Sequence, residues 1–300
     1  MTRLRLGTRG SRLATTQARW VARRLEQRAP GLSVELMEIA TLGDRISGAL
    51  GPERGSSFFT KEIEAALRDG RIDAAVHSCK DLATAPAPGL LLAAVPVRED
   101  PRDALVGGPA GGFAALPPGA TVGTGSPRRQ AFLSAARPDL VFVGLRGNVP
   151  TRVARVDEGA VDAVVLAVAG LRRLGLEDRI TGVLDEDTLP PAAAQGALAV
   201  QVRADDAAAL ELAARIDDAA AHAEVRAERA CLRALEAGCM APVGVLARPE
   251  GEDLVVRAAV AAPGRVVRAT ARGPAAEAER TGARVAAELL AALGLASLRD

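Results

Sequence analysis

Hydrophobic and polar residues follow one another in two different periods along the chain. Short apolar or alternating runs, typical of β-strands, cover residues 4–8, 33–40 and 73–76. Longer stretches with apolar residues at every third or fourth position, typical of amphipathic helices, cover residues 11–28 and begin again at residue 60. Strands that alternate with helices indicate helices layered on a sheet of parallel strands, so the pattern predicts an α/β fold.

The same order of elements occurs twice. The turn sequence GTRGS at residues 7–11 precedes the first predicted helix, and GTGS at residues 123–126 precedes a later one. Residues 69–76 and 158–165 also resemble each other (DGRIDAAV and EGAVDAVV). We therefore predict two related α/β lobes, residues 1–97 with 197–215 returning to them, and residues 98–196. Proline-rich passages at 96–101 and 189–191 are the expected crossings between the lobes.

From about residue 219 the pattern changes. A helical run continues to residue 237 and stops at Gly238, and short strand-like pieces follow at residues 254–259 and 265–269. Residues 277–293 have the period of an amphipathic helix. These elements predict a small α+β domain at residues 219–300.

Charge changes this picture locally. The 300-residue chain is 49% hydrophobic and 25% charged, as in ordinary globular proteins, and its net charge is only +1. Five arginines nevertheless lie in residues 128–152, with Asp139 as the one acid among them. Such a local cluster on a balanced chain indicates a pocket for a small polyanion, because guanidinium groups bind carboxylates or phosphates in bidentate fashion. Aromatic residues make up only 2% of the chain, which argues against stacking on single-stranded nucleic acid.

The two Gly-Thr turns are candidate anion sites. Backbone N–H groups at a helix start favour an anion, and Arg9, Arg128 and Arg129 lie beside these turns in the sequence. The alternative is ordinary N-capping by Ser11 and Ser126. Because both turns are flanked by arginines, we favour anion binding.

Two further segments could take part in catalysis. His77-Ser78-Cys79-Lys80-Asp81 follows a predicted strand, where α/β proteins bind ligands, so Asp81 could act as a general acid or base beside Lys80. A surface Lys-Asp pair is the alternative, and in isolation the better one. Cys239 follows a helix in a loop between Gly238 and Gly244 and could be a nucleophile, although an inert thiol is favoured on the residues alone.

Other classes of site and location are disfavoured. His77 and His222 have no companions at metal-ligand spacing, so no metal is expected, and no GxxxxGK[ST] or GxGxxG motif is present. Three cysteines are too few for a disulfide framework, and neither a secretory signal nor a long apolar span is visible. We therefore expect a cytoplasmic protein without a membrane partner.

Nine segments together resemble one family, the hydroxymethylbilane synthases, also called porphobilinogen deaminases. They are residues 7–11, 75–81, 98–104, 123–130, 145–152, 166–175, 194–197, 227–230 and 235–244. The resemblance implies two lobes like those of periplasmic binding proteins with a cleft between them, and a small C-terminal domain that carries the cofactor cysteine. It also implies a transferase of tetrapyrrole (haem and porphyrin) biosynthesis, which joins four porphobilinogen units head to tail into hydroxymethylbilane and releases ammonia at each step.

The resemblance also implies residue roles. Cys239 matches the cysteine that holds a dipyrromethane cofactor through a thioether, and Asp81 matches the catalytic carboxylate, which assists ammonia loss and stabilises the cationic azafulvene. The positions that match cofactor-binding residues are Lys80, Thr124, Ser126, Arg128, Arg129 and Arg146. Those that match substrate-binding residues are Arg9, Ser11, Arg152, Arg173 and Gln195. The implied partner is porphobilinogen, with no nucleic acid, and the implied state is a monomer.

The chain departs from the family pattern at three places. Residues 55–59 read GSSFF where the family has a Gly-Lys-Gly-Leu-Phe-like stretch, Ala83 replaces a common proline, and Pro127 replaces a more usual leucine. The altered loop raises one rival hypothesis, a paralogue that keeps the fold without turnover. A two-lobed carboxylate receptor is the other, and Asp81 together with Cys239 argues against it because binding alone requires neither.

Overall fold

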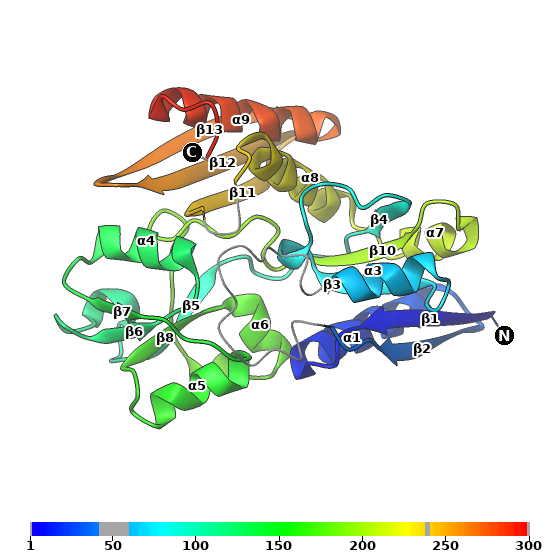
Figure 1. The fold of residues 1–300 in the computed structure, drawn as a ribbon, viewed down its shortest axis with the longest axis horizontal. Coiled ribbons are helices and arrows are strands. Elements are labelled where there is room, and N and C mark those ends of the chain that lie inside the picture. The colour runs from blue at the N-terminus through cyan, green and yellow to red at the C-terminus, as the bar shows by residue number, and fades with distance from the viewer. Residues whose placement is uncertain (1, 42–59, 238–240, 299–300) are drawn as a thin grey trace. The chain divides into compact units, whose positions relative to one another are not determined.

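The structure, a computed structural model, describes residues 2–41, 60–237 and 241–298 (Figure 1). The altered loop at 55–59 and Cys239 lie outside the described residues. The chain divides into two compact units, which we call the first unit (Met1–Glu99 and Ala197–Val225) and the second unit (Asp100–Gly196 and Arg226–Asp300). Among the described residues, each of the three predicted domains contains one sheet. The exact domain boundaries stay predictions.

The sheet of the first unit has five strands. Their order is β2 (Leu32–Glu38), β1 (Thr2–Thr8), β3 (Ala74–Ser78), β10 (Leu198–Arg203) and β4 (Leu90–Ala94). β1 pairs in parallel with β2 and β3, whereas β10 runs antiparallel to both β3 and β4. The three predicted strands are confirmed, but the sheet is mixed, because β10 belongs to the returning part of the chain.

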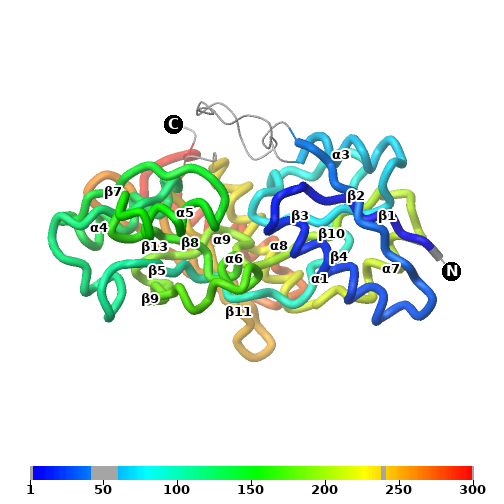
Figure 2. Tube along the Cα trace, turned by 90° about the horizontal axis from the view of Figure 1, so that it is seen from below, coloured from blue at the N-terminus to red at the C-terminus, as the bar shows by residue number. Residues whose placement is uncertain are grey.

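Helices cover both faces of this sheet (Figure 2). α1 (Arg12–Arg28) packs on Ala74 and Val76 of β3, and α3 (Lys61–Arg68) packs on Ala75 between them, because neighbouring strand residues point to opposite faces. α7 (Ala207–Ala214) adds Ala209 and Ala213 to the α1 side.

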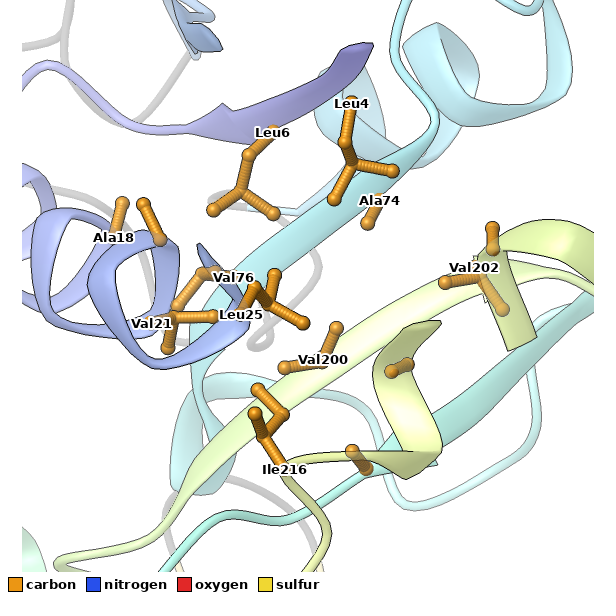
Figure 3. Packing of buried hydrophobic residues seen from close by; sticks show 14 of the residues in the cluster. Leu4, Leu6, Ala18, Val21, Leu25, Ala74, Val76, Val200, Val202 and Ile216 are labelled. Atoms are coloured by element: carbon orange, nitrogen blue, oxygen red, sulfur yellow. The ribbon is translucent and has the colours of Figure 1, made fainter. Parts of the chain in front are cut away.

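The buried face of α1 has the helical period that the sequence predicts. Ala18, Val21 and Leu25 point toward Leu4 and Leu6 of β1 in the core of the first unit (Figure 3). A fully buried leucine such as Leu25 stabilises the fold by about 2 kcal/mol. This core fixes the start of α1 against the end of β1, where the first Gly-Thr turn lies.

The second unit repeats the architecture of the first. Its five-stranded sheet has the order β7 (Val141–Val143), β6 (Thr121–Gly123), β8 (Ala163–Ala167), β5 (Asp103–Gly107) and β9 (Ile180–Val183). β6 is parallel to β7 and β8, and β5 is antiparallel to β8 and β9, as in the first sheet. Three helices accompany this sheet: α4 (Pro127–Ala136), α5 (Val149–Asp157) and α6 (Val168–Arg173). The predicted repeat of two lobes is confirmed, because β1 corresponds to β6 and β3 to β8.

The C-terminal part of the chain contains an antiparallel sheet and two helices. Its strands are β11 (Val243–Glu250), β12 (Asp253–Ala262) and β13 (Arg265–Pro274). β12 and β13 are longer than predicted, and β11 was not predicted. α8 (Ala219–Ala234) and α9 (Ala278–Leu293) complete the predicted α+β composition. Gly282 permits the close crossing of these helices, since a Cβ there would lie 2.1 Å from the Ala227 carbonyl oxygen.

Short 3₁₀ helices occur at Cys79–Asp81, Gly112–Ala115, Glu177–Arg179 and Ala275–Glu277. Among the described residues no helix is long and apolar enough to cross a membrane. In the same part of the chain no group of three or more His, Cys, Asp or Glu side chains could hold a metal ion.

Candidate active site

Both Gly-Thr turns cap a helix with a serine. Ser11 Oγ accepts a hydrogen bond from Ala14 N at 3.3 Å, and Ser126 Oγ accepts one from Arg129 N at 3.4 Å. The capping alternative therefore describes the geometry correctly. Capping uses each hydroxyl as an acceptor and leaves its hydrogen to donate, so it does not compete with anion binding. A cavity of about 480 Å³, lined by Gly10, Ser11, Glu38, Ile39 and Ala40, lies at the first turn.

The turn with Asp81 is held on two sides within the first unit. Ser78 Oγ donates to Gln17 Oε1 at 3.1 Å, and Cys79 N donates to Ala197 O at 3.0 Å. Cys79 is fully buried, Lys80 is exposed and Asp81 is half-buried. The buried cysteine thus anchors a one-turn helix from which the two charged residues project at the end of β3.

His77 lies immediately before this turn and is neutral at physiological pH. Burial lowers the pKa of His77 to about 4, the Gln201 side chain opposes that shift, and the positive charge of Arg9 adds to it. A neutral imidazole places no further positive charge beside Arg9. His77 Nε2 and Gln201 Oε1 are buried and make no hydrogen bond with any described residue.

In the second unit, two of the predicted site arginines share one buried carboxylate. Asp103, at the start of β5, is 0% exposed, and its Oδ2 accepts from Arg128 Nη2 at 2.6 Å. Its Oδ1 accepts from Arg129 Nε at 3.1 Å and Nη2 at 2.7 Å. Arg128 also donates to Pro190 O, and Arg129 donates to Val165 O at 2.8 Å. Both guanidinium planes are therefore fixed by the strands and loops around them.

The arginine pair keeps both charge and donors for a ligand. Two guanidinium groups face one carboxylate, so the local charge is +1. Burial lowers the pKa of Arg128, with Asp103 opposing the shift and Arg129 adding to it. A guanidinium has five N–H groups, and the bonds above use two on Arg128 and three on Arg129. The other three and two make no hydrogen bond with any described residue, which suits carboxylate ligands.

Gly125 allows the loop that carries Arg146 to approach the turn that contains Thr124. A Cβ on Gly125 would lie 2.6 Å from the backbone oxygen of Leu145, so only glycine allows the two turns to approach so closely. Leu145 N donates to Thr124 O at 3.3 Å, and Thr124 Oγ1 accepts from Ser126 N at 3.2 Å. The exposed Arg146 therefore follows directly after the residue that contacts the Thr124 turn.

Three other predicted site residues have defined positions in the second unit. Arg152 is half-buried and donates to Gly147 O at 2.9 Å; burial lowers its pKa and the charge of Arg129 adds to the shift. Arg173 donates to Gly196 O at 2.6 Å, and Gln195 Nε2 donates to Pro101 O at 2.6 Å and to Asp103 Oδ1 at 3.1 Å. Arg152 and Gln195 are thus placed near the arginine pair.

One arginine of the sequence cluster has a different setting. Arg137 donates to both carboxylate oxygens of Asp139, at 2.8 and 2.6 Å, and to the carbonyls of Phe113, Ala114 and Leu116. It therefore holds a loop, and the count of five clustered arginines overstated the ligand site. Conversely, Asp103 was not singled out from the sequence. The feature of the sequence that could have indicated Asp103 is an acidic residue at the start of an otherwise apolar strand, DALVG.

The described residues thus place the predicted site residues in two groups. Arg9, Ser11, Lys80 and Asp81 belong to the first unit. The second unit holds Thr124, Ser126, Arg128, Arg129, Arg146, Arg152, Arg173 and Gln195. The second group is rich in guanidinium groups, which suit carboxylate ligands, and the first group contains one carboxylate, that of Asp81.

Comparisons with known proteins agree over nearly the whole chain. Residues 4–211 match the family model described as "Porphobilinogen deaminase, dipyromethane cofactor binding domain", and residues 222–291 match "Porphobilinogen deaminase, C-terminal domain". A porphobilinogen deaminase of Roseiflexus sp. (strain RS-1) is 48% identical over 290 residues, 95% of each chain. One of Xanthomonas oryzae pv. oryzae is 48% identical over 304 residues, 98% of this chain and 100% of that protein.

Solved structures share less with the chain. A TRAP periplasmic solute binding protein from Desulfovibrio salexigens has a TM-score of 0.43 and 10% identity, with 72% of each chain covered. The Bordetella pertussis BvgS VFT2 domain has a TM-score of 0.41 and 18% identity, covering 72% of this chain and 85% of that one. These similarities are too low to bear on function.

Proposed function

The chain belongs to the porphobilinogen deaminase family, and from this premise we propose the roles of its residues in the reaction. The enzyme is a transferase of tetrapyrrole biosynthesis that polymerises porphobilinogen into hydroxymethylbilane, and its cofactor is dipyrromethane. Family membership decides against a receptor without catalysis. A cytoplasmic location, a monomeric state and the lack of nucleic-acid partners stay predictions from the sequence.

The arginine pair fits the cofactor. A dipyrromethane built from two porphobilinogen units bears an acetate and a propionate on each ring, so it presents four carboxylates. The second unit offers uncommitted N–H groups on Arg128 and Arg129 beside a single acid, Asp103. When bound, dipyrromethane supplies the pyrrole carbon at which the new chain starts. Arg128, Arg129, Arg146 and the hydroxyls of Thr124 and Ser126 hold its carboxylates, and Cys239 anchors it.

The remaining cations hold the substrate. Arg9 and Ser11 at the first turn, and Arg152 and Arg173 in the second unit, orient the acetate and propionate groups of the incoming units. Gln195, whose amide N–H groups bond to Pro101 O and Asp103 Oδ1, supports this binding by holding Asp103. A hydrogen bond to a charged group contributes about 1.5–3 kcal/mol, so each bidentate arginine matters for affinity. Lys80 adds an ammonium group on a flexible side chain next to Asp81 in the sequence, which suits a ligand whose length changes.

Asp81 is the catalytic carboxylate. Positive charge develops on the substrate's methylene carbon as ammonia leaves, and a fixed anion close to it stabilises that charge. The same carboxylate then accepts the proton released when the pyrrole ring regains its aromaticity. The observation that supports this role is the one-turn helix at the end of β3, in which the buried Cys79 and the Ser78–Gln17 bond fix Asp81.

Asp81→Asn tests the role because it keeps the side-chain volume and removes the charge. We expect turnover to fall by about 10²–10⁴-fold, whereas cofactor attachment, read by intact-protein mass, and the melting temperature stay close to wild type. Asp139→Asn is the matched control, because Asp139 pairs with Arg137 away from the proposed site, and its turnover should not change. Near-normal turnover of the Asp81→Asn holoenzyme would sink the mechanism.

A further inference from the structure

Residues 190–196, which we call the junction segment, form a buried stretch without helix or strand just before β10. Its backbone groups bond to side chains and strands of the second unit. Arg128 donates to Pro190 O, Arg173 donates to Gly196 O at 2.6 Å, and Val245 N of β11 donates to Pro191 O at 2.9 Å. Two arginines assigned above to ligands therefore take part of their orientation from this segment.

A buried carboxylate outside the proposed site fixes the middle of the junction segment. Glu228 on α8 is 0% exposed, and both its oxygens accept backbone hydrogen bonds. Oε1 accepts from Ala247 N of β11 at 2.8 Å, and Oε2 accepts from Ala194 N at 2.5 Å. One side chain thus joins a helix, a strand and the junction segment.

Ala194 is held in an unfavourable conformation. Its φ is +61°, in the left-handed region that residues with a Cβ rarely adopt. Such a residue persists only where its surroundings determine it, and here the Ala194 N–H is bonded to the Glu228 carboxylate. The next residue, Gln195, donates to Asp103 Oδ1, the oxygen that also accepts from Arg129. Three consecutive contacts therefore lead from Glu228 to the arginine pair.

We propose that Glu228 is a positioning residue for substrate and cofactor binding, which holds Ala194 in its left-handed conformation and thereby sets Gln195, Asp103 and the arginine pair. The proposal rests on the function assigned above to Arg128 and Arg129. The effect of Glu228 on ligand binding passes through Ala194, because its other oxygen is bonded to Ala247 N of β11. The same residue therefore links the C-terminal sheet to the junction segment.

Glu228→Gln is the informative change because it keeps the volume and replaces one acceptor oxygen by an NH₂ donor. Ala247 N and Ala194 N bond to different oxygens of Glu228, so replacing one oxygen by NH₂ leaves one of these N–H groups facing a donor. The loss falls on Ala194, because Ala247 is held in the β11–β12 ladder whereas Ala194 can leave its strained left-handed conformation. Gln195 then moves away from Asp103. Substrate binding should weaken more than the chemical step, because Asp81 is untouched.

A matched control lies one turn earlier on the same helix. Glu224 is also buried, and it pairs with Arg98 at 2.8 Å. Glu224→Gln removes an acid of the same kind from α8 but leaves the bond to Ala194. Both variants should lower the melting temperature, so a purely structural role for Glu228 predicts the same kinetic behaviour for the two.

The experiment compares holoenzymes in steady-state assays with porphobilinogen, with rates normalised to the fraction that carries the cofactor by intact mass. We expect KM of Glu228→Gln to rise about tenfold with kcat nearly retained, and KM of Glu224→Gln to stay within about twofold of wild type. Adding Ala194→Gly to Glu228→Gln should recover much of the lost KM, because glycine adopts φ +61° without strain. If Glu228→Gln does not fold, Glu228→Asp, which withdraws the carboxylate by one methylene, is judged by the same KM criterion.

The positioning role of Glu228 and the assignment of the binding site can be refuted separately. A KM for Glu228→Gln no higher than that of Glu224→Gln overturns the positioning role, as does a rise in KM that Ala194→Gly does not relieve. Arg129→Leu in the same assay examines the proposed site itself. If Arg129→Leu binds porphobilinogen and cofactor normally, the site assignment is wrong, whatever the Glu228 variants do.

Discussion

Asp103 and Arg129 are joined through two nitrogens and one oxygen: Nε and Nη2 of the arginine both donate to Oδ1 of the aspartate, at 3.1 and 2.7 Å. The second oxygen of Asp103 is bonded to Arg128. A carboxylate with no exposed surface thus neutralises half the charge of a buried arginine pair. Its function is to make that pair possible, because two adjacent buried cations without an anion would be strongly unfavourable.

Asp103→Asn should therefore destabilise the protein sharply. The variant keeps the shape of the side chain but leaves two buried guanidinium groups without a counter-charge, which costs about 3–5 kcal/mol. Denaturant unfolding of the wild type and the variant measures this difference. Asp139→Asn, which removes the partner of the more exposed Arg137, should have a much smaller effect. Equal losses in the two variants would contradict the account of the arginine pair.

Gly125→Ala should disturb the cationic turn without removing any charged group. Its Cβ would lie 2.6 Å from the Leu145 backbone oxygen, and backbone cannot rotate aside as a side chain can, so the turn before Arg146 must move. We expect a loss of about 1–3 kcal/mol in unfolding free energy together with a higher KM. Gly144→Ala is the control, because a Cβ there meets no atom within 4 Å and φ is not positive. Similar KM values for the two variants would refute the explanation.

His77 should make the first unit sensitive to acid. The pKa of His77 is about 4 in the folded protein, because of burial, against an ordinary value of 6.5. Below pH 6.5 the unfolded chain therefore takes up the proton before the folded one does. The stability from the neutral imidazole is present above pH 6.5 and is lost as the pH falls toward 4, by about 3 kcal/mol in total.

His77→Leu removes this dependence and isolates it from other titrating groups. The difference in unfolding free energy between wild type and variant should change steadily between pH 6.5 and 4, in the direction that disfavours the wild type at low pH. Two stability curves that stay parallel over that range would show that His77 titrates normally.

Sequence periodicity was sufficient for elements such as α1 and β1, because they bury residues at regular intervals within one local segment. The repeated Gly-Thr turns likewise indicated two similar lobes. Periodicity did not predict every strand, and β11 is an example. Periodicity also does not show which distant segments pair with each other, so the antiparallel position of β10 next to β3 was not predicted. Pro127 is explained only by the structure, where it occupies the first turn of α4, a position that favours proline.

The candidate site was also only partly predictable from the sequence. Arginines in a cluster indicated an anion site, but the sequence could not distinguish Arg128 and Arg129, fixed around Asp103, from Arg137, which binds Asp139 and nearby carbonyls. The distinction depends on an aspartate twenty-five and twenty-six positions away in sequence from the pair. Asp103 and Glu228 were missed because the sequence around an acidic residue does not show which distant groups it will bond to.

The most direct test of the central claim is intact-protein mass spectrometry with peptide mapping of the purified chain after addition of porphobilinogen. The account predicts a two-pyrrole adduct on the peptide that contains Cys239. The peptide with Cys231 should stay unmodified, because burial, with the charge of Glu228 adding to it, raises the pKa of that thiol to about 12. An unmodified mass after substrate is supplied, or an adduct on any other residue, would contradict the claim that this chain assembles a dipyrromethane cofactor and elongates it.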